Sequence, residues 1–138
     1  MMTTVCAMLL SSALSLSSLN SCNGAVAVLY YEEFDVQTYN AITRHNIELS
    51  ASNRICIAEM KQRNRMIDLL ISGQPRSGFG EGAVRLELIT GREEYFVDSH
   101  GCVSGETLRA CLSPSQFEAL KKQVNELMNT SESAKPGA

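Results

Sequence analysis

Apolar residues occupy every second position of segment 84–88. This period-two pattern is typical of a half-buried strand, with Arg85 and Glu87 on the solvent side. A turn and a second apolar run follow, so we predict that residues 84–97 form a β-hairpin. Cys102 then begins a short third strand. The clearest pattern in the chain is therefore a small antiparallel sheet.

Helical spacing of apolar residues appears on both sides of this sheet, at about 59–72 and 114–128. Ser113 and Gln116 form an S-x-x-Q capping box, and Pro114 occupies the first helical position. The predicted fold class is therefore α+β, a small antiparallel sheet covered by these two helices.

Three other segments have weaker patterns. Residues 26–31 are β-prone and could form an edge strand or a tether, and the alternative is a buried strand at 25–31 that follows a disordered leader. Segment 34–50 fits helix and strand and is assigned to extended structure. Residues 129–138 are small and polar, which predicts a disordered tail. The length favours one domain, which we place at 22–128.

The N-terminus lacks charged side chains, because no Lys, Arg, Asp or Glu occurs before Glu32. The apolar centre at 5–19 is too short and too rich in serine for a membrane span. It is typical of the apolar region of a secretory signal peptide, predicted at 1–21. An uncleaved anchor and a cytoplasmic chain are the alternatives.

Residues 19–22, Leu-Asn-Ser-Cys, resemble a bacterial lipobox. The resemblance implies that Cys22 carries a lipid and tethers the protein to a membrane. Asn20 departs from the small or aliphatic residue usual at its position. The competing site, an A-x-A sequence that ends at Ala27, would give a mature chain that starts at Val28.

The remaining cysteines favour a disulfide. Cys102 and Cys111 are close in sequence, and in an oxidising compartment they are natural partners. Cys56 is the alternative disulfide partner for either of them, although its apolar surroundings favour a buried free thiol. Three cysteines remain if Cys6 is removed and Cys22 is lipidated, which leaves one unpaired.

One constellation could be chemical. Asp98, His100 and Cys102 would share a face of an extended strand and could act as a thiol nucleophile with its base, or hold a metal. The D-x-x-G pattern of 98–101 predicts a type I turn instead, which separates these side chains. No metal or cofactor site is predicted, because no fourth ligand has suitable spacing.

Charge and glycine spacing argue against two other functional classes, nucleic-acid binders and nucleotide-binding proteins. The net charge of −3 and the pI near 5.4 argue against a nucleic-acid binder. The three alternate glycines of 78–82 follow a predicted helix and precede a strand, which is the wrong context for a phosphate loop.

By elimination, the leading hypothesis is a small exported or lipid-anchored protein of the bacterial envelope, periplasmic or secreted. It would act without catalysis, by binding another protein, as an inhibitor, an immunity protein or an assembly accessory does. Its contact surface would be a loop or a sheet edge, with Gly73–Gly82 as the first candidate. The alternatives are a thiol enzyme that uses Cys102 with His100 and Asp98, and a structural envelope lipoprotein.

Overall fold

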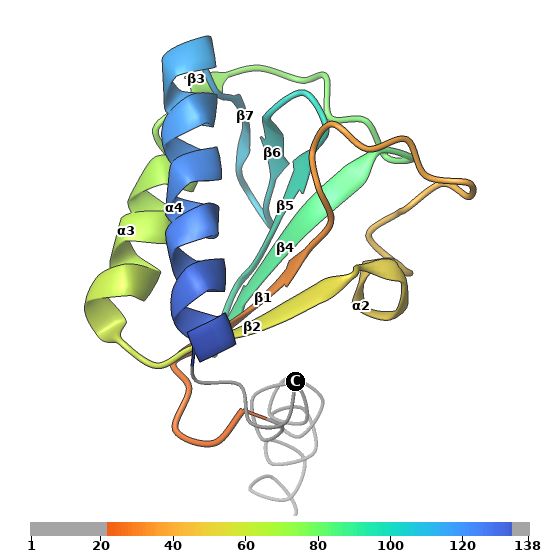
Figure 1. The fold of residues 1–138 in the computed structure, drawn as a ribbon. Coiled ribbons are helices and arrows are strands. Elements are labelled where there is room, and N and C mark those ends of the chain that lie inside the picture. The colour runs from red at the N-terminus through yellow and green to blue at the C-terminus, as the bar shows by residue number, and fades with distance from the viewer. Residues whose placement is uncertain (1–21, 134–138) are drawn as a thin grey trace, which may run out of the picture.

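The computed structural model describes residues 22–133 (Figure 1). The strands are β1 (Ala27–Tyr31), β2 (Asn53–Ile57), β3 (Gln74–Pro75), β4 (Val84–Thr90), β5 (Glu94–Asp98), β6 (Cys102–Ser104) and β7 (Arg109–Cys111). The helices are α2 (Ile47–Ser50), α3 (Met60–Leu70) and α4 (Pro114–Ser133).

All seven strands belong to one sheet, in the order β2-β1-β4-β5-β6-β7-β3. Every neighbouring pair is antiparallel. The predicted α+β class is confirmed, and so is the hairpin, which is β4 and β5. The predicted extent of the sheet is wrong, because four further strands join the hairpin and the short third strand.

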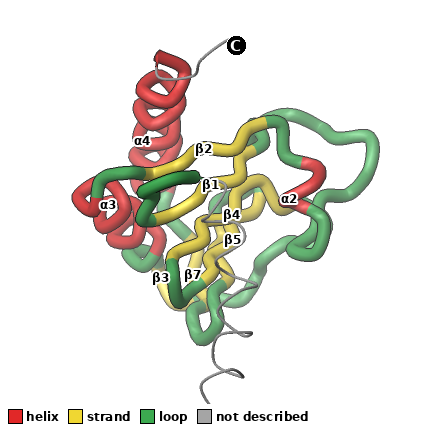
Figure 2. The backbone as a smooth tube through the Cα atoms, turned by 90° about the horizontal axis from the view of Figure 1, so that it is seen from below, coloured by secondary structure: helices red, strands yellow, loops and turns green. Residues whose placement is uncertain are grey.

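The sheet has a covered face and a partly covered one. Helices α3 and α4 pack against the first, and the short α2 lies on the other side (Figures 1 and 2). We call the face that carries α2 the outer face. A second group of buried apolar side chains lies there, which includes Val28, Tyr30, Ile47, Ile89 and Phe96. The sheet is therefore buried on both faces over its central strands.

Strand β4 shows this double burial most clearly. All seven of its residues are buried, including Arg85 and Glu87. The prediction that these two side chains face solvent is wrong, because α2 and the segment before it cover this part of the outer face. Arg85 donates a hydrogen bond to the carbonyl of Val36 at 3.1 Å and so holds that segment to the strand.

Strand β1 is central rather than an edge or a tether. It pairs with β2 on one side and β4 on the other along all five of its residues. Cleavage after Ala27 would remove the first residue of this strand. Both β1 neighbours come from later in the chain, so the sequence pattern of 26–31 does not reveal its place.

The helices differ from prediction at their ends and in their buried faces. In α3, Met66 and Leu70 are fully buried, whereas Met60 and Ile71, two other apolar residues of the predicted range 59–72, are about half exposed.

The capping box of α4 is confirmed, because Ser113 Oγ accepts from Gln116 N and Gln116 Oε1 accepts from Ser113 N. Helix α4 continues to Ser133, into the segment predicted as a tail.

Segment 34–50 is mostly irregular rather than extended. Ile42 forms one isolated parallel bridge with Ala83, and α2 occupies the end of the segment. Asn46 supports the turn before α2, since its Oδ1 accepts from Thr43 N at 2.8 Å. This irregular segment covers the outer face with apolar side chains such as Ile42 and Ile47.

Gly101 is required where the sheet meets α4. Its φ is +91°, and an added Cβ would lie 3.1–3.3 Å from ring atoms of Phe117. Positive φ is unfavourable for residues with a Cβ, and the Phe117 ring is itself packed against the core. The backbone and the packing therefore both favour glycine at this position.

We expect Gly101→Ala to lower the free energy of unfolding by about 1–3 kcal/mol. Gly91→Ala is the matched control, because no atom lies within 4 Å of its added Cβ. Denaturant unfolding of both variants measures the difference. Equal stability of the two variants would contradict the argument.

Candidate functional site

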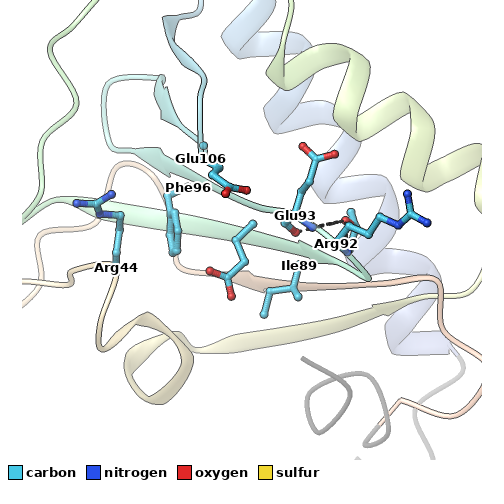
Figure 3. A pocket seen from close by; sticks show the side chains of 9 residues that line it. Arg44, Ile89, Arg92, Glu93, Phe96 and Glu106 are labelled. Carbon is cyan, nitrogen blue, oxygen red and sulfur yellow. Dashed lines mark hydrogen bonds between the residues drawn. The ribbon is translucent and has the colours of Figure 1, made fainter. Parts of the chain in front are cut away.

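The outer face carries a hollow of about 430 Å³ beside α2. Its lining is mostly charged: Arg44, Ile89, Thr90, Arg92, Glu93, Glu94, Phe96, Gly105 and Glu106. Figure 3 shows Arg44 at one end, Arg92 and Glu93 at the other, and Phe96 with Glu106 between them. The hollow therefore combines charges of both signs with an apolar floor.

A second hollow of about 260 Å³ adjoins the first. It is lined by Arg44, Arg76, Ser77, Gly78, Phe79, Glu81, Val103, Ser104 and Arg109. Arg44 lines both hollows, and Ser104 of the second precedes Gly105 of the first. We call the two together the outer groove. Arg76, Glu81 and Arg109 line the second hollow alone, Arg92, Glu93, Glu94 and Glu106 line the first alone, and Arg44 is common to both.

The loop at 76–82 forms one wall of the groove and is held in place. Arg44 Nε pairs with Glu81 Oε2 at 2.8 Å, and the Arg44 guanidinium lies 5.9 Å from the centre of the Phe79 ring. Gly80 N donates to the buried Asp98 Oδ2 at 2.8 Å. The loop is thus anchored to the sheet rather than being a free connector.

Asp98 organises this corner through backbone contacts. Its Oδ1 accepts from His100 N and from Cys102 N, both at 2.9 Å. Gly101 N donates to the Asp98 carbonyl at 3.2 Å, which confirms the predicted turn. The Asp98 carboxylate therefore accepts three backbone hydrogen bonds, a structural role that fits a buried aspartate.

The predicted chemical set is not assembled. Cys102 Sγ is bonded to Cys111 Sγ, and the two residues face each other across β6 and β7. A sulfur in a disulfide is not a thiolate nucleophile. His100 is exposed, and its Nδ1 lies 3.3 Å from Ser99 Oγ. Within the described residues, the three side chains therefore do not form a nucleophile with its base.

A second disulfide joins Cys22 to Cys56. The interpretation of Cys56 as a buried free thiol is wrong, because Cys56 is exposed and bonded. A thioether-linked lipid on Cys22 would use the same sulfur, so lipidation and this disulfide exclude each other. Cleavage after Ala27 would remove Cys22 and the bond with it. Cys6 lies outside the described residues.

Three carboxyl groups converge next to the groove. Glu48 of α2, Glu87 of β4 and Glu94 of β5 each place a carboxylate oxygen within 4.8 Å of the other two. Glu48 and Glu94 are exposed, whereas Glu87 is 1% exposed. Glu94 also lines the larger hollow. Among residues 22–133, these three carboxylates lie close enough together to hold a metal ion.

Glu87 is in an unusual electrostatic environment. Burial raises its pKa from 4.5 to about 9, and the negative charges of Glu94 and Glu48, with a hydrogen bond to Glu48, add to the increase. Its Oε1 has no hydrogen-bond partner among the described residues. At neutral pH this carboxyl group therefore holds a proton.

The sequence pattern does not predict this cluster. The period-two pattern of β4 placed Glu87 on a solvent face, and nothing nearby in sequence pointed to Glu48 or Glu94. The only local signal was an acidic residue between leucines at 86 and 88.

Comparisons with protein-family models, curated proteins and solved structures gave no match. Within 22–133, no helix combines the length and the apolar character that a membrane span requires.

Proposed function

We propose that this is a small exported protein that binds another protein through the outer groove. The observation that carries the proposal is the division of charge along the groove. The second hollow is lined by Arg44, Arg76 and Arg109 with one carboxylate, Glu81, which pairs with Arg44. The first is lined by Glu93, Glu94 and Glu106 together with Arg44 and Arg92, so the second hollow is the more basic of the two. Such an arrangement suits an extended partner segment that places an acidic residue at the second hollow and a basic residue near the carboxylates of the first.

The apolar side chains on the floor of the groove provide contact area for a partner, in addition to the charges that select it. Phe96 and Ile89 line the first hollow among its charged residues, and Phe79 lines the loop wall of the second. Aromatic side chains in a partly enclosed site supply contact area, while the surrounding charges set orientation. The anchored loop reduces the conformational entropy lost on binding, because it is already held by Asp98 and Arg44.

Export is the location that the disulfides favour, because they persist in oxidising compartments. The uncharged, signal-like N-terminus supports the same location. Since Cys22 is bonded to Cys56, we favour a form without a lipid, in the periplasm or secreted.

Site-specific photo-crosslinking in the native host tests the binding function. A photoreactive residue at the exposed Ser77 should give a discrete adduct with one other protein, identified by mass spectrometry. The same residue at Lys122, exposed on α4, is the matched position away from the groove. Deletion of the loop is unsuitable, because its contacts with Asp98 and Arg44 hold the fold.

Charge reversal then separates specific from incidental adducts. We expect Arg76→Glu with Arg109→Glu to reduce the Ser77 adduct roughly tenfold, because both arginines face the groove. Arg65→Glu with Lys122→Glu, on the helical side, should leave it unchanged. Equal adducts from Ser77 and Lys122, or an adduct that ignores the arginine changes, would refute the proposal.

A further inference from the structure

The cluster of Glu48, Glu87 and Glu94 is built from three separate elements. Helix α2 supplies the first, the central strand β4 the second and β5 the third. The α2 segment is held by Ile47, which is fully buried in the outer-face core. The three carboxyl groups are therefore brought together by the fold and not by one flexible surface loop.

Glu87 gives a second observation that points to a ligand. It is 1% exposed, and although its carboxyl group shares a hydrogen bond with Glu48, its Oε1 atom has no hydrogen-bond partner in the described part of the chain. Buried polar atoms in native proteins nearly always have a partner, so such an atom requires an explanation. The side chain is aimed into the cluster, because its carboxylate lies within 4.8 Å of the other two. A bound cation would satisfy it.

We propose that Glu48, Glu87 and Glu94 form a binding site for a hard divalent cation, Ca²⁺. Three carboxylates offer up to about six oxygens, and Ca²⁺ takes six to eight oxygen ligands at about 2.3–2.6 Å. Ligands on opposite sides of such an ion are about 4.8 Å apart, and the carboxylate oxygens lie within that span. Within the described residues no His or Cys joins this group, which disfavours zinc.

The ion has a route to the site. Glu48 and Glu94 are exposed, and Glu94 also lines the larger hollow of the outer groove. Water from that side can complete the coordination, while Glu87 provides the inner ligand from the sheet. The same ion would place a positive charge at the acidic end of the groove.

Titration of the full-length, EDTA-treated protein with CaCl₂ tests the site by calorimetry. We expect one Ca²⁺ per chain with Kd about 10⁻⁴–10⁻³ M, the range of extracellular calcium modules. Glu87→Gln and Glu48→Gln should each weaken binding roughly tenfold or more, since affinity follows ligand charge. Glu106→Gln is the control, because it removes a groove carboxylate outside the cluster.

A second readout distinguishes loss of a ligand from loss of the fold. Ca²⁺ should raise the Tm of the wild type and of Glu106→Gln, but not of Glu87→Gln, with all three folded in EDTA. The absence of saturable binding up to 10 mM CaCl₂, or equal binding by Glu87→Gln, would overturn the proposal. MgCl₂ binding tighter than CaCl₂ would overturn the assignment of the ion.

Discussion

Replacement of Cys22 and Cys56 together by alanine should lower the free energy of unfolding by about 4 kcal/mol. The bond spans 34 residues of sequence and connects the segment before β1 to the sheet's edge strand β2. On the chain-entropy model a disulfide stabilises by restricting the unfolded chain, and the effect grows with loop length. Denaturant unfolding of both proteins, under non-reducing conditions, measures the loss.

The second disulfide provides the comparison. Cys102 and Cys111 are 9 residues apart and already face each other in the β6–β7 pair. The same model gives about 3 kcal/mol for so short a loop, so Cys102→Ala with Cys111→Ala should be less destabilised. If replacing Cys22 and Cys56 lowered the free energy of unfolding by less than replacing Cys102 and Cys111 did, the result would contradict the argument. If native protein instead carried a lipid on Cys22, Cys56 would react with iodoacetamide without prior reduction.

Local sequence signals predicted the elements that depend on local interactions. The hairpin of β4 and β5, the capping box at Ser113 and the turn at Asp98 each involve residues close together in sequence. The strands that were missed or misplaced depend on distant partners. Strand β1 pairs with residues 53–57 and 86–90, and its place in the centre follows from those pairings.

Short strands are also difficult to predict from the sequence. Strands β6 and β7 have three residues each and β3 has two, too few to show a period. Gly73 illustrates another limit of local patterns, because it follows α3 as a helix-ending glycine would but does not have a positive φ. An added Cβ would instead lie 2.7 Å from the Cys111 carbonyl oxygen, so its small size permits close approach of the β7 backbone.

The carboxylate cluster was beyond sequence reasoning for a related reason. Alternation along β4 assigns Glu87 to the face opposite Leu86 and Leu88, and that assignment is correct. Whether this face meets solvent depends on Ile42, Ile47 and their neighbours, from a segment without a clear pattern. Burial of Glu87 is therefore a tertiary property, and so is its shifted pKa.

Replacement of Glu87 by glutamine should stabilise the metal-free protein at neutral and alkaline pH. The folded state holds the Glu87 proton up to about pH 9, whereas the unfolded chain releases it near 4.5. Stability from this group is therefore complete below pH 4.5 and is lost as pH rises toward 9. Between these two pH values, the free energy of unfolding of the wild type should fall by about 1.4 kcal/mol for each pH unit relative to that of Glu87→Gln.

Unfolding free energies of both proteins in EDTA, measured from pH 5.5 to pH 8, give the difference directly. The other titratable groups are the same in both proteins, so their contributions to the difference cancel. The difference in unfolding free energy should therefore widen to about 3 kcal/mol at pH 8. Glu106→Gln, an exposed carboxylate, should run parallel to the wild type. Parallel curves for Glu87→Gln as well would mean that Glu87 is ionised in the folded protein, so that a partner other than a proton already compensates its charge.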